Sequence, residues 1–252
     1  MAAWGNTMTI THRWTDGNDV VFHRFYLQTE AYYNSLVGGI CNRQDYVPHN
    51  LSESISDVIN MIQSTNNTRP IIPDSNQFIR SDAVTSITET EKKWLIDLNV
   101  TMVFDLRTDQ ERREKPSPLA TDSRFTYICA PVKNGSTVPD TPDDVSASYI
   151  AMIDDEFMQV IDRIMNASAN VLFFCNAGKD RSGVVSAVLL HRLGYDRAYI
   201  VNDYMKSAER LRSVLEQYLQ EHPDVDRNVI TPHPEYIEHF LDWFERTYDG
   251  GV

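Results

Sequence analysis

The stretch VLFFCNAGKDRSGVVSAVLL, residues 171–190, decides the fold of this chain. The short apolar run at 170–174 is bounded by polar residues, which predicts a buried strand. A second apolar run at 182–194 predicts a helix that is buried nearly all round, and Gly194 stands where a glycine commonly ends a helix. The polar loop at 175–181 therefore leaves the carboxyl end of a strand and enters a helix. Ligands of open α/β sheets bind at such positions.

Further strands and helices are predicted on both sides of this stretch. Apolar and β-branched runs at 100–106 and 125–132 predict two more strands. Thr88 and Glu91 have the spacing of a capping box, which would open a helix that carries Trp94 and Leu98. Strands that alternate with helices predict an α/β fold with a central, mostly parallel sheet flanked by helices. Apolar residues at helical spacing predict further helices over 52–63, 145–165, 199–220 and 235–246.

Length and composition indicate one acidic globular domain. The chain has 252 residues, 42% of them hydrophobic and 23% charged, so we expect a single domain over residues 1–252. Its 23 Lys and Arg against 36 Asp and Glu give a formal net charge of −13, which would repel nucleic acid and anionic membranes. We therefore expect no nucleic-acid partner. We also expect no stable membrane insertion, because no apolar stretch is long enough to span a bilayer.

The cysteine content indicates a reducing compartment. Cys41, Cys129 and Cys175 form an odd, sparse set that offers no disulfide framework. The first residues lack a basic region followed by an apolar run, so we expect no signal peptide and a cytoplasmic location. The seven histidines show no spacing typical of metal ligands, so we expect neither a metal nor another cofactor.

Cys175 and Arg181 lie at the two ends of the loop, six positions apart. Backbone amides of such a loop, together with the N-terminus of the helix behind it, form a site that attracts anions. The same environment stabilises a thiolate, the nucleophilic form of cysteine, which can attack phosphorus. The planar guanidinium of Arg181 can hold two oxygens of a phosphoryl group. The pattern predicts a phosphocysteine intermediate that water hydrolyses, with Ser182 donating a hydrogen bond to the departing sulfur.

A cysteine followed by an arginine six residues later is a weak signal by itself. Neither Cys41 nor Cys129 has such a partner, and the strand, the helix, Gly178 and the serine after the arginine strengthen the signal at Cys175. The alternative is a buried, inert cysteine in an ordinary strand–helix turn. A nucleotide-binding phosphate loop fits less well, because Asp180 rather than serine or threonine follows the Gly-Lys pair.

The loop FCNAGKDRSG, residues 174–183, resembles that of the bacterial and fungal Cys-x5-Arg protein tyrosine phosphatases, which reads His-Cys-x-x-Gly-Lys-x-Arg. Cys175, Gly178, Lys179 and Arg181 match this pattern, whereas Phe174 replaces a histidine that helps to hold the thiolate. The resemblance runs from about residue 30 to the end and implies one phosphatase domain, with an insertion at residues 41–72. Other stretches that resemble the family in the same order are YNSLVGGI, FIRSDAVTSITETEKKWL, VFDLRTDQERREKPSP, NDYMKS and HPEYIEHFLDWFERTYDG.

A tyrosine leaving group must be protonated as it departs, which requires a carboxylic acid near the scissile oxygen. The resemblance favours Asp180, the aspartate inside the loop. Asp105, at the end of the predicted strand 100–106, is the second candidate, with a structural hydrogen-bonding role as its alternative. A third set is Asp140, Asp143 and Asp144, for which helix capping and contact with solvent is the favoured alternative.

Two basic residues could extend the phosphate site. Lys179 at the rim of the pocket could meet an additional phosphate, which would favour phosphoinositides; its alternative is a solvated loop lysine. Arg107 falls at a strand end on the ligand side of the predicted sheet. The substrate-binding residues that we expect are Asn176, Ala177, Gly178, Lys179 and Arg107.

We therefore expect a phosphoric monoester hydrolase of the protein tyrosine phosphatase type. The resemblance implies phosphotyrosine as the substrate and could extend to phosphoserine and phosphothreonine. One alternative is a phosphoinositide phosphatase on the same scaffold, and another is a phosphate-binding module with little turnover, which only Phe174 suggests. A sulfurtransferase fits less well, because a loop that carries a persulfide has no need of Asp180 and Ser182. The natural substrate, its pathway and the oligomeric state stay open.

Overall fold

The computed structural model describes residues 62–248. Most of the predicted helix over 52–63 and most of the predicted insertion at 41–72 lie outside this range. Residues 62–72 lie inside it and contribute an edge strand to the sheet, with Asn67 and Arg69 buried. The chain consists of two units, residues 1–49 and residues 50–252, and the described residues all belong to the second.

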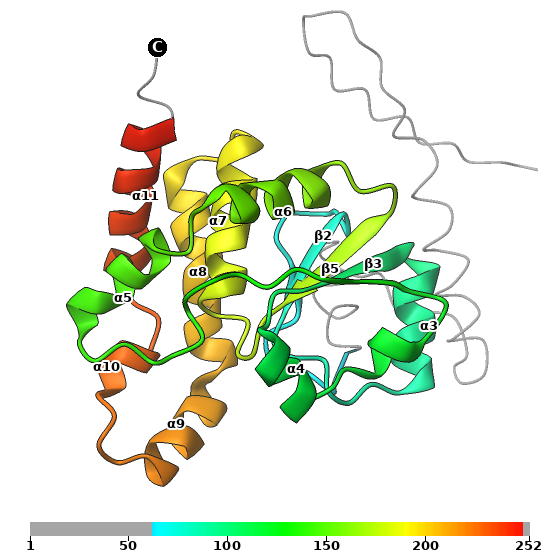
Figure 1. The fold of residues 1–252 in the computed structure, drawn as a ribbon, viewed down its shortest axis with the longest axis horizontal. Helices are drawn as coiled ribbons and strands as arrows, with labels where there is room; N and C mark the ends of the chain where they lie inside the picture. Colours follow the sequence, from blue (N-terminus) through cyan, green and yellow to red (C-terminus); the bar gives the residue numbers. More distant parts are fainter. Residues whose placement is uncertain (1–61, 249–252) are drawn as a thin grey trace, which may run out of the picture. The chain divides into compact units, whose positions relative to one another are not determined.

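The described residues form one five-stranded sheet with the strand order β1-β2-β5-β3-β4 (Figure 1). β1 is antiparallel to β2, whereas the pairs β2–β5, β5–β3 and β3–β4 are parallel. The prediction of a mostly parallel sheet is thereby confirmed. The strands are β1 (Arg69–Pro70), β2 (Phe78–Ser81), β3 (Val100–Asp105), β4 (Thr126–Cys129) and β5 (Asn170–Phe174).

Helices flank the sheet on both sides, with α3 packed against β3 and α7 packed against β2 and β5 (Figure 1). None of the described helices is long and apolar enough to cross a membrane. The helices are α3 (Glu89–Asp97), α4 (Asp109–Glu114), the 3-10 helix η1 (Pro118–Thr121), α5 (Pro142–Ile150), α6 (Asp155–Met165), α7 (Arg181–Arg192), α8 (Arg197–Arg210), α9 (Arg212–Glu221), α10 (Arg227–Ile230) and α11 (Pro234–Tyr248).

Several predicted elements are confirmed by their local chemistry. Thr88 and Glu91 form the capping box that opens α3. Helix α7 ends before Gly194, which has a φ of +79° and therefore a backbone conformation that glycine adopts without strain. Tyr195 N–H donates to the carbonyl of Leu190 beyond that turn, which completes a common C-terminal helix motif.

Two predicted helices are each divided in two. The helix expected over 145–165 ends at Ile150, and a new helix begins at Asp155 because the Asp154 carboxylate accepts a hydrogen bond of 2.8 Å from the amide of Phe157. The helix expected over 199–220 is interrupted at Leu211 between α8 and α9. Strands β1 and β2 were not predicted, since both are short and carry arginine residues.

The most deeply buried elements are β5 and α7. Residues 171–174 of β5 are completely buried between β2 and β3, and α7 buries every residue from Arg181 to Leu190. The loop that joins them is therefore anchored at both ends in the core. Such anchoring keeps a binding loop in one geometry.

Candidate active site

The β5–α7 loop places Cys175 directly after the strand and Arg181 at the first residue of the helix. Both side chains are nearly buried, with 3% and 2% of their surface exposed. Gly178 has a φ of +66°, and a Cβ atom on it would lie 2.5 Å from the carbonyl oxygen of Ser81. Glycine is therefore required at this position because the loop packs against the end of β2.

The backbone amides of the loop are the next feature of the site. Within the described part of the chain, none of the backbone N–H groups of residues 176–182 donates a hydrogen bond to a protein acceptor. Helix α7 begins here, and the amides at a helix N-terminus carry partial positive charge. Unpaired amides that line one loop are suited to bind the oxygens of an anion.

Arg181 is fixed by Glu111, a residue that the sequence did not indicate as functional. The two terminal nitrogens of Arg181 donate to the two carboxylate oxygens of Glu111 at 2.7 and 2.6 Å. Asn176 donates to the same carboxylate at 2.6 Å, and the amide of Thr108 donates to it at 2.7 Å. Glu111 thus links α4 to both ends of the loop. Its only sequence signal was the capping box Thr108-x-x-Glu111.

The pKa values of this pair favour two charged groups. Burial by itself raises the pKa of Glu111, but the hydrogen bonds from Arg181 and Thr108 outweigh it and lower the pKa below its ordinary value. Burial lowers the pKa of Arg181, and the opposing effects of Glu111 and of the Cys175 sulfur raise it above its ordinary value. The guanidinium therefore stays charged in a nearly buried place beside the cysteine.

Asp180 lies at the N-cap position of α7 but makes no capping hydrogen bond. Its carboxylate accepts a hydrogen bond of 2.6 Å from the hydroxyl of Tyr149, which is in turn 2.7 Å from the hydroxyl of Tyr204. Burial and the nearby Asp180 charge raise the pKa of Tyr149 well above its ordinary value, so the phenol stays a donor. Asp180 is thus a partly exposed carboxylate in the loop, held in place by a buried tyrosine pair.

Lys179 is neither at a pocket rim nor solvated. Only 5% of its surface is exposed, and its ammonium donates to the carbonyls of Ile230 and Val229 at 2.8 and 3.3 Å. It also lies 3.3 Å from the Asp180 carboxylate. Both expectations for this residue were wrong, because its side chain turns inward and ties the loop to α10.

Asp105 and Arg107 are fully buried and bind each other, so neither is placed to act on a substrate. The Asp105 carboxylate accepts two hydrogen bonds from the Arg107 side chain at 2.9 and 2.7 Å, and another from the Tyr127 hydroxyl. Arg107 also donates to the carbonyl of Lys115 and lies 5.2 Å above the ring centre of Phe174. The geometry favours the structural alternative for Asp105 and corrects the expectation that Arg107 contacts substrate.

The remaining loop side chains take different places. The Ser182 hydroxyl is buried and donates to the Ser81 carbonyl at 3.4 Å, and among the described residues no hydrogen bond joins it to the Cys175 sulfur. Ala177 is half-buried and Asn176 is exposed. Asp140, Asp143 and Asp144 are exposed, and the last two lie in the first turn of α5, whose N-cap Thr141 makes no side-chain capping hydrogen bond.

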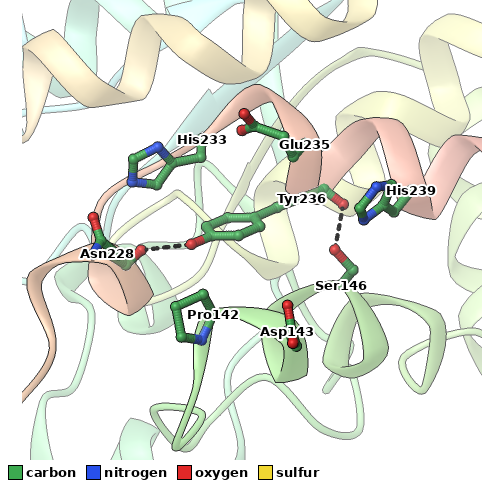
Figure 2. A pocket seen from close by; sticks show the side chains of 8 residues that line it. All are labelled: Pro142, Asp143, Ser146, Asn228, His233, Glu235, Tyr236 and His239. Carbon is green, nitrogen blue, oxygen red and sulfur yellow. Dashed lines mark hydrogen bonds between the residues drawn. The ribbon is translucent and has the colours of Figure 1, made fainter.

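A pocket of about 590 Å³ lies between α5, α10 and α11 (Figure 2), and neither Cys175 nor Arg181 is among the residues that line it. The Ser146 hydroxyl donates a hydrogen bond to the backbone carbonyl of Tyr236, and the Tyr236 hydroxyl donates one to the backbone carbonyl of Asn228 (Figure 2). The Tyr236 ring lies between these two hydrogen bonds (Figure 2). The lining contains Asp143 and Glu235 but no lysine or arginine. This pocket is therefore unsuited to a phosphate group. Within the part of the chain that the structure describes, no cluster of side chains could hold a metal ion.

The sequence of this chain is similar to the sequences of known phosphatases. Residues 64–252 match the group described as "Tyrosine phosphatase family". A "Tyrosine-protein phosphatase" of Nostoc commune is 31% identical over 147 residues, which cover 54% of this chain and 50% of that protein. The "Triple specificity protein phosphatase PtpB" of Mycobacterium tuberculosis is 38% identical over 66 residues, 25% of this chain and 24% of that one.

The chain therefore spans about half the length of the first curated relative that it matches. Among solved structures, TpbA of P. aeruginosa has a TM-score of 0.36 and 14% identity, covering 71% of this chain and 98% of that one. The match at residues 64–252 covers most of the present chain. This chain belongs to the tyrosine phosphatase family.

Proposed function

We propose that this protein hydrolyses phosphotyrosine through a phosphocysteine intermediate. The observation that carries the proposal is the pairing of a nearly buried Cys175 with Arg181, which Glu111 fixes beside loop amides that have no acceptor among residues 62–248. Fixed donors of this kind can bind the phosphoryl oxygens and stay matched to them as charge moves in the transition state. The active site is the β5–α7 loop.

In the first step the Cys175 sulfur attacks phosphorus, and the bond from phosphorus to the tyrosine oxygen breaks. Asp180 gives its proton to that oxygen, so the tyrosine leaves as a neutral phenol. In the second step water attacks phosphorus, Asp180 takes the proton of the water, and the sulfur leaves as a thiolate. The products are tyrosine and inorganic phosphate, and the enzyme returns to its starting state.

Ser182 would assist the second step by donating a hydrogen bond to the sulfur. Its hydroxyl donates to the Ser81 carbonyl at 3.4 Å, a long contact that this role would require it to give up. Phosphoserine and phosphothreonine are weaker candidates for the substrate. The expected cytoplasmic location and the expected lack of a nucleic-acid partner stay predictions.

A phosphoinositide substrate receives no support from the side chain that suggested it. Lys179 would have to release two carbonyls of α10 before it could meet a second phosphate. The idea of a binding module without turnover depended on Phe174. The side chain of Phe174 is completely buried, and its ring packs beneath the Arg107 guanidinium. We therefore favour an active enzyme over both alternatives.

The test is turnover of para-nitrophenyl phosphate and of a phosphotyrosine peptide by the wild type, Cys175→Ser and Asp180→Asn. We expect no turnover in the first variant and a loss of about 10²–10⁴-fold in the second, the usual range for a general acid. The loss should be smaller for para-nitrophenyl phosphate, because its leaving group needs less protonation. Equal turnover in wild type and Cys175→Ser would end the proposal.

A further inference from the structure

Four successive carbonyl groups of the loop, those of residues 176–179, accept hydrogen bonds from donors on other parts of the fold. The side-chain amide of Asn67 donates to the carbonyls of Ala177 and Gly178 at 3.1 and 3.0 Å. Arg80 donates to the carbonyls of Gly178 and Lys179 at 2.6 and 3.3 Å. Three successive carbonyls of the loop are therefore held by two side chains.

A planar trans peptide points its N–H opposite to its C=O. A donor that holds the carbonyl of one residue outward therefore turns the amide of the next residue inward. Asn67 and Arg80 accordingly set the direction of the amides of Gly178, Lys179 and Asp180. These amides belong to the set that has no protein acceptor among the described residues.

The two side chains are themselves fixed by a buried ion cluster. Asp203 accepts a hydrogen bond of 2.6 Å from Arg80 and one of 3.0 Å from Arg69. Arg69 also donates to the backbone carbonyl of Asn67 at 3.2 Å and to the Oδ1 atom of its side chain. Burial lowers the pKa of Arg69 to about 9, so the guanidinium is still charged at neutral pH.

The cluster also places charge behind the loop. Two guanidinium groups and one carboxylate leave a net positive charge, and Arg69, Arg80 and Asp203 are each at most 2% exposed. A buried charge is only weakly screened by solvent and salt. It therefore adds to the attraction that the loop exerts on an anion.

We propose that Asn67 and Arg80 are positioning residues for phosphate binding: they act on the carbonyl side of the loop and thereby aim its amides at the phosphoryl oxygens. This inference rests on the proposed function of the loop. It predicts that phosphate affinity depends on residues that never touch the phosphate.

The experiment replaces Asn67 with aspartate, which has the same shape. Asn67→Asp keeps the Oδ1 acceptor for Arg69, but its carboxylate can donate nothing to the carbonyls of Ala177 and Gly178. The affinity for inorganic phosphate is measured by calorimetry in a Cys175→Ser background, so the readout does not depend on turnover. We expect the Kd to rise about tenfold or more, as when a buried hydrogen bond loses its donor.

Asn170→Asp is the matched control. The side-chain amide of Asn170 donates to the carbonyl of Leu98 at 2.8 Å, and Asn170 begins β5 at the end of the sheet opposite to the loop. The same chemical change should therefore lower the melting temperature by a similar amount and leave the phosphate Kd unchanged. A merely structural role for Asn67 would make the two variants behave alike.

Arg80→Lys gives a second measurement if Asn67→Asp does not fold. A lysine keeps the positive charge but cannot reach Asp203 and the loop carbonyls with separate nitrogens. A phosphate Kd within twofold of the parent in the variants that fold would overturn the proposal, as would a Cys175→Ser protein that binds no phosphate. If only the positioning role were wrong, the phosphate Kd would be unchanged and the wild type would still turn over its substrate. If the proposed function were wrong, the wild type itself would show no turnover.

Discussion

At the scale of single residues, Glu111 is the side chain on which the geometry of Arg181 depends most. Glu111→Gln would keep the shape but lose the charge and one acceptor of the bidentate pair. We expect kcat/KM for para-nitrophenyl phosphate to fall about 10- to 100-fold, because misplaced catalytic groups commonly lose that much rate. Glu114→Gln on the same helix is the control, since Glu114 is exposed and, among the described residues, its side chain accepts a hydrogen bond from Gln110 alone. Similar losses in both variants would contradict the assigned role.

A second prediction at this scale concerns two glycines with left-handed backbones. An alanine at Gly178 would bring its Cβ to 2.5 Å from the Ser81 carbonyl, whereas at Gly194 the Cβ would meet nothing within 4 Å. In both variants the positive φ angle alone should lower the free energy of unfolding by roughly 1–2 kcal/mol. Urea unfolding should show that loss for Gly194→Ala and a clearly larger one for Gly178→Ala. Only Gly178→Ala should also weaken phosphate binding, and equal losses would refute the close approach.

At the scale of elements, helix α6 depends on a cap that the sequence prediction overlooked. The Asp154 carboxylate accepts from the Phe157 amide, and this hydrogen bond is the main reason why the pKa of Asp154 lies below its ordinary value. Asp154→Ala should lower the free energy of unfolding by about 1 kcal/mol at neutral pH. A depressed pKa in the folded state gives stability above the unfolded value, about 3.9 for aspartate, that is lost as pH falls through the folded value. Urea unfolding should therefore show that the difference in free energy of unfolding between the wild type and Asp154→Ala becomes smaller in acid. A difference that becomes larger in acid would be contrary evidence.

Element prediction from the sequence succeeded where periodicity and capping agreed. The structure confirms four features that a local sequence pattern predicted. These are the apolar strands β3 and β5, the capping box of α3 and the glycine that follows α7. Strand β2 carried none, because its sequence FIRS holds two polar residues that are buried by partners distant in the chain. Periodicity also continued across Ile150 and Leu211, so the breaks after α5 and α8 could not be predicted from it.

At the scale of the whole molecule, the site divides into a contiguous part and a distributed part. Cys175, Asp180 and Arg181 stand within one loop, so the candidate site could be located from the local sequence, with the role of Asp180 implied by the family resemblance. The residues that hold the loop come from far along the chain: Glu111 is 70 residues from Arg181, and Asn67 is 110 residues from Ala177. Only the fold brings them together, because parallel β2, β3 and β5 end at the same edge of the sheet.

The cluster of Asp203 with Arg69 and Arg80 joins β1 and β2 to α8 and should therefore control the stability of the whole fold. Burial by itself raises the pKa of Asp203, but the two arginine charges outweigh it, so the pKa lies below its ordinary value. The stability from this group is present above about pH 4, the unfolded value, and is lost as pH falls through the folded one. The wild type should thus lose stability in acid.

Asp203→Asn tests this contribution, because it leaves two buried guanidinium groups without a carboxylate. Breaking a buried ion pair on one side commonly removes about 3–5 kcal/mol, a large part of the roughly 5–15 kcal/mol that holds a domain folded. Urea unfolding at neutral pH should show that loss, and the variant should lose less stability in acid than the wild type does. Asp242→Asn is the control, since its ion pair with Arg197 is exposed and should contribute under about 1 kcal/mol. Equal effects of the two substitutions would show that the buried cluster does not hold the fold together.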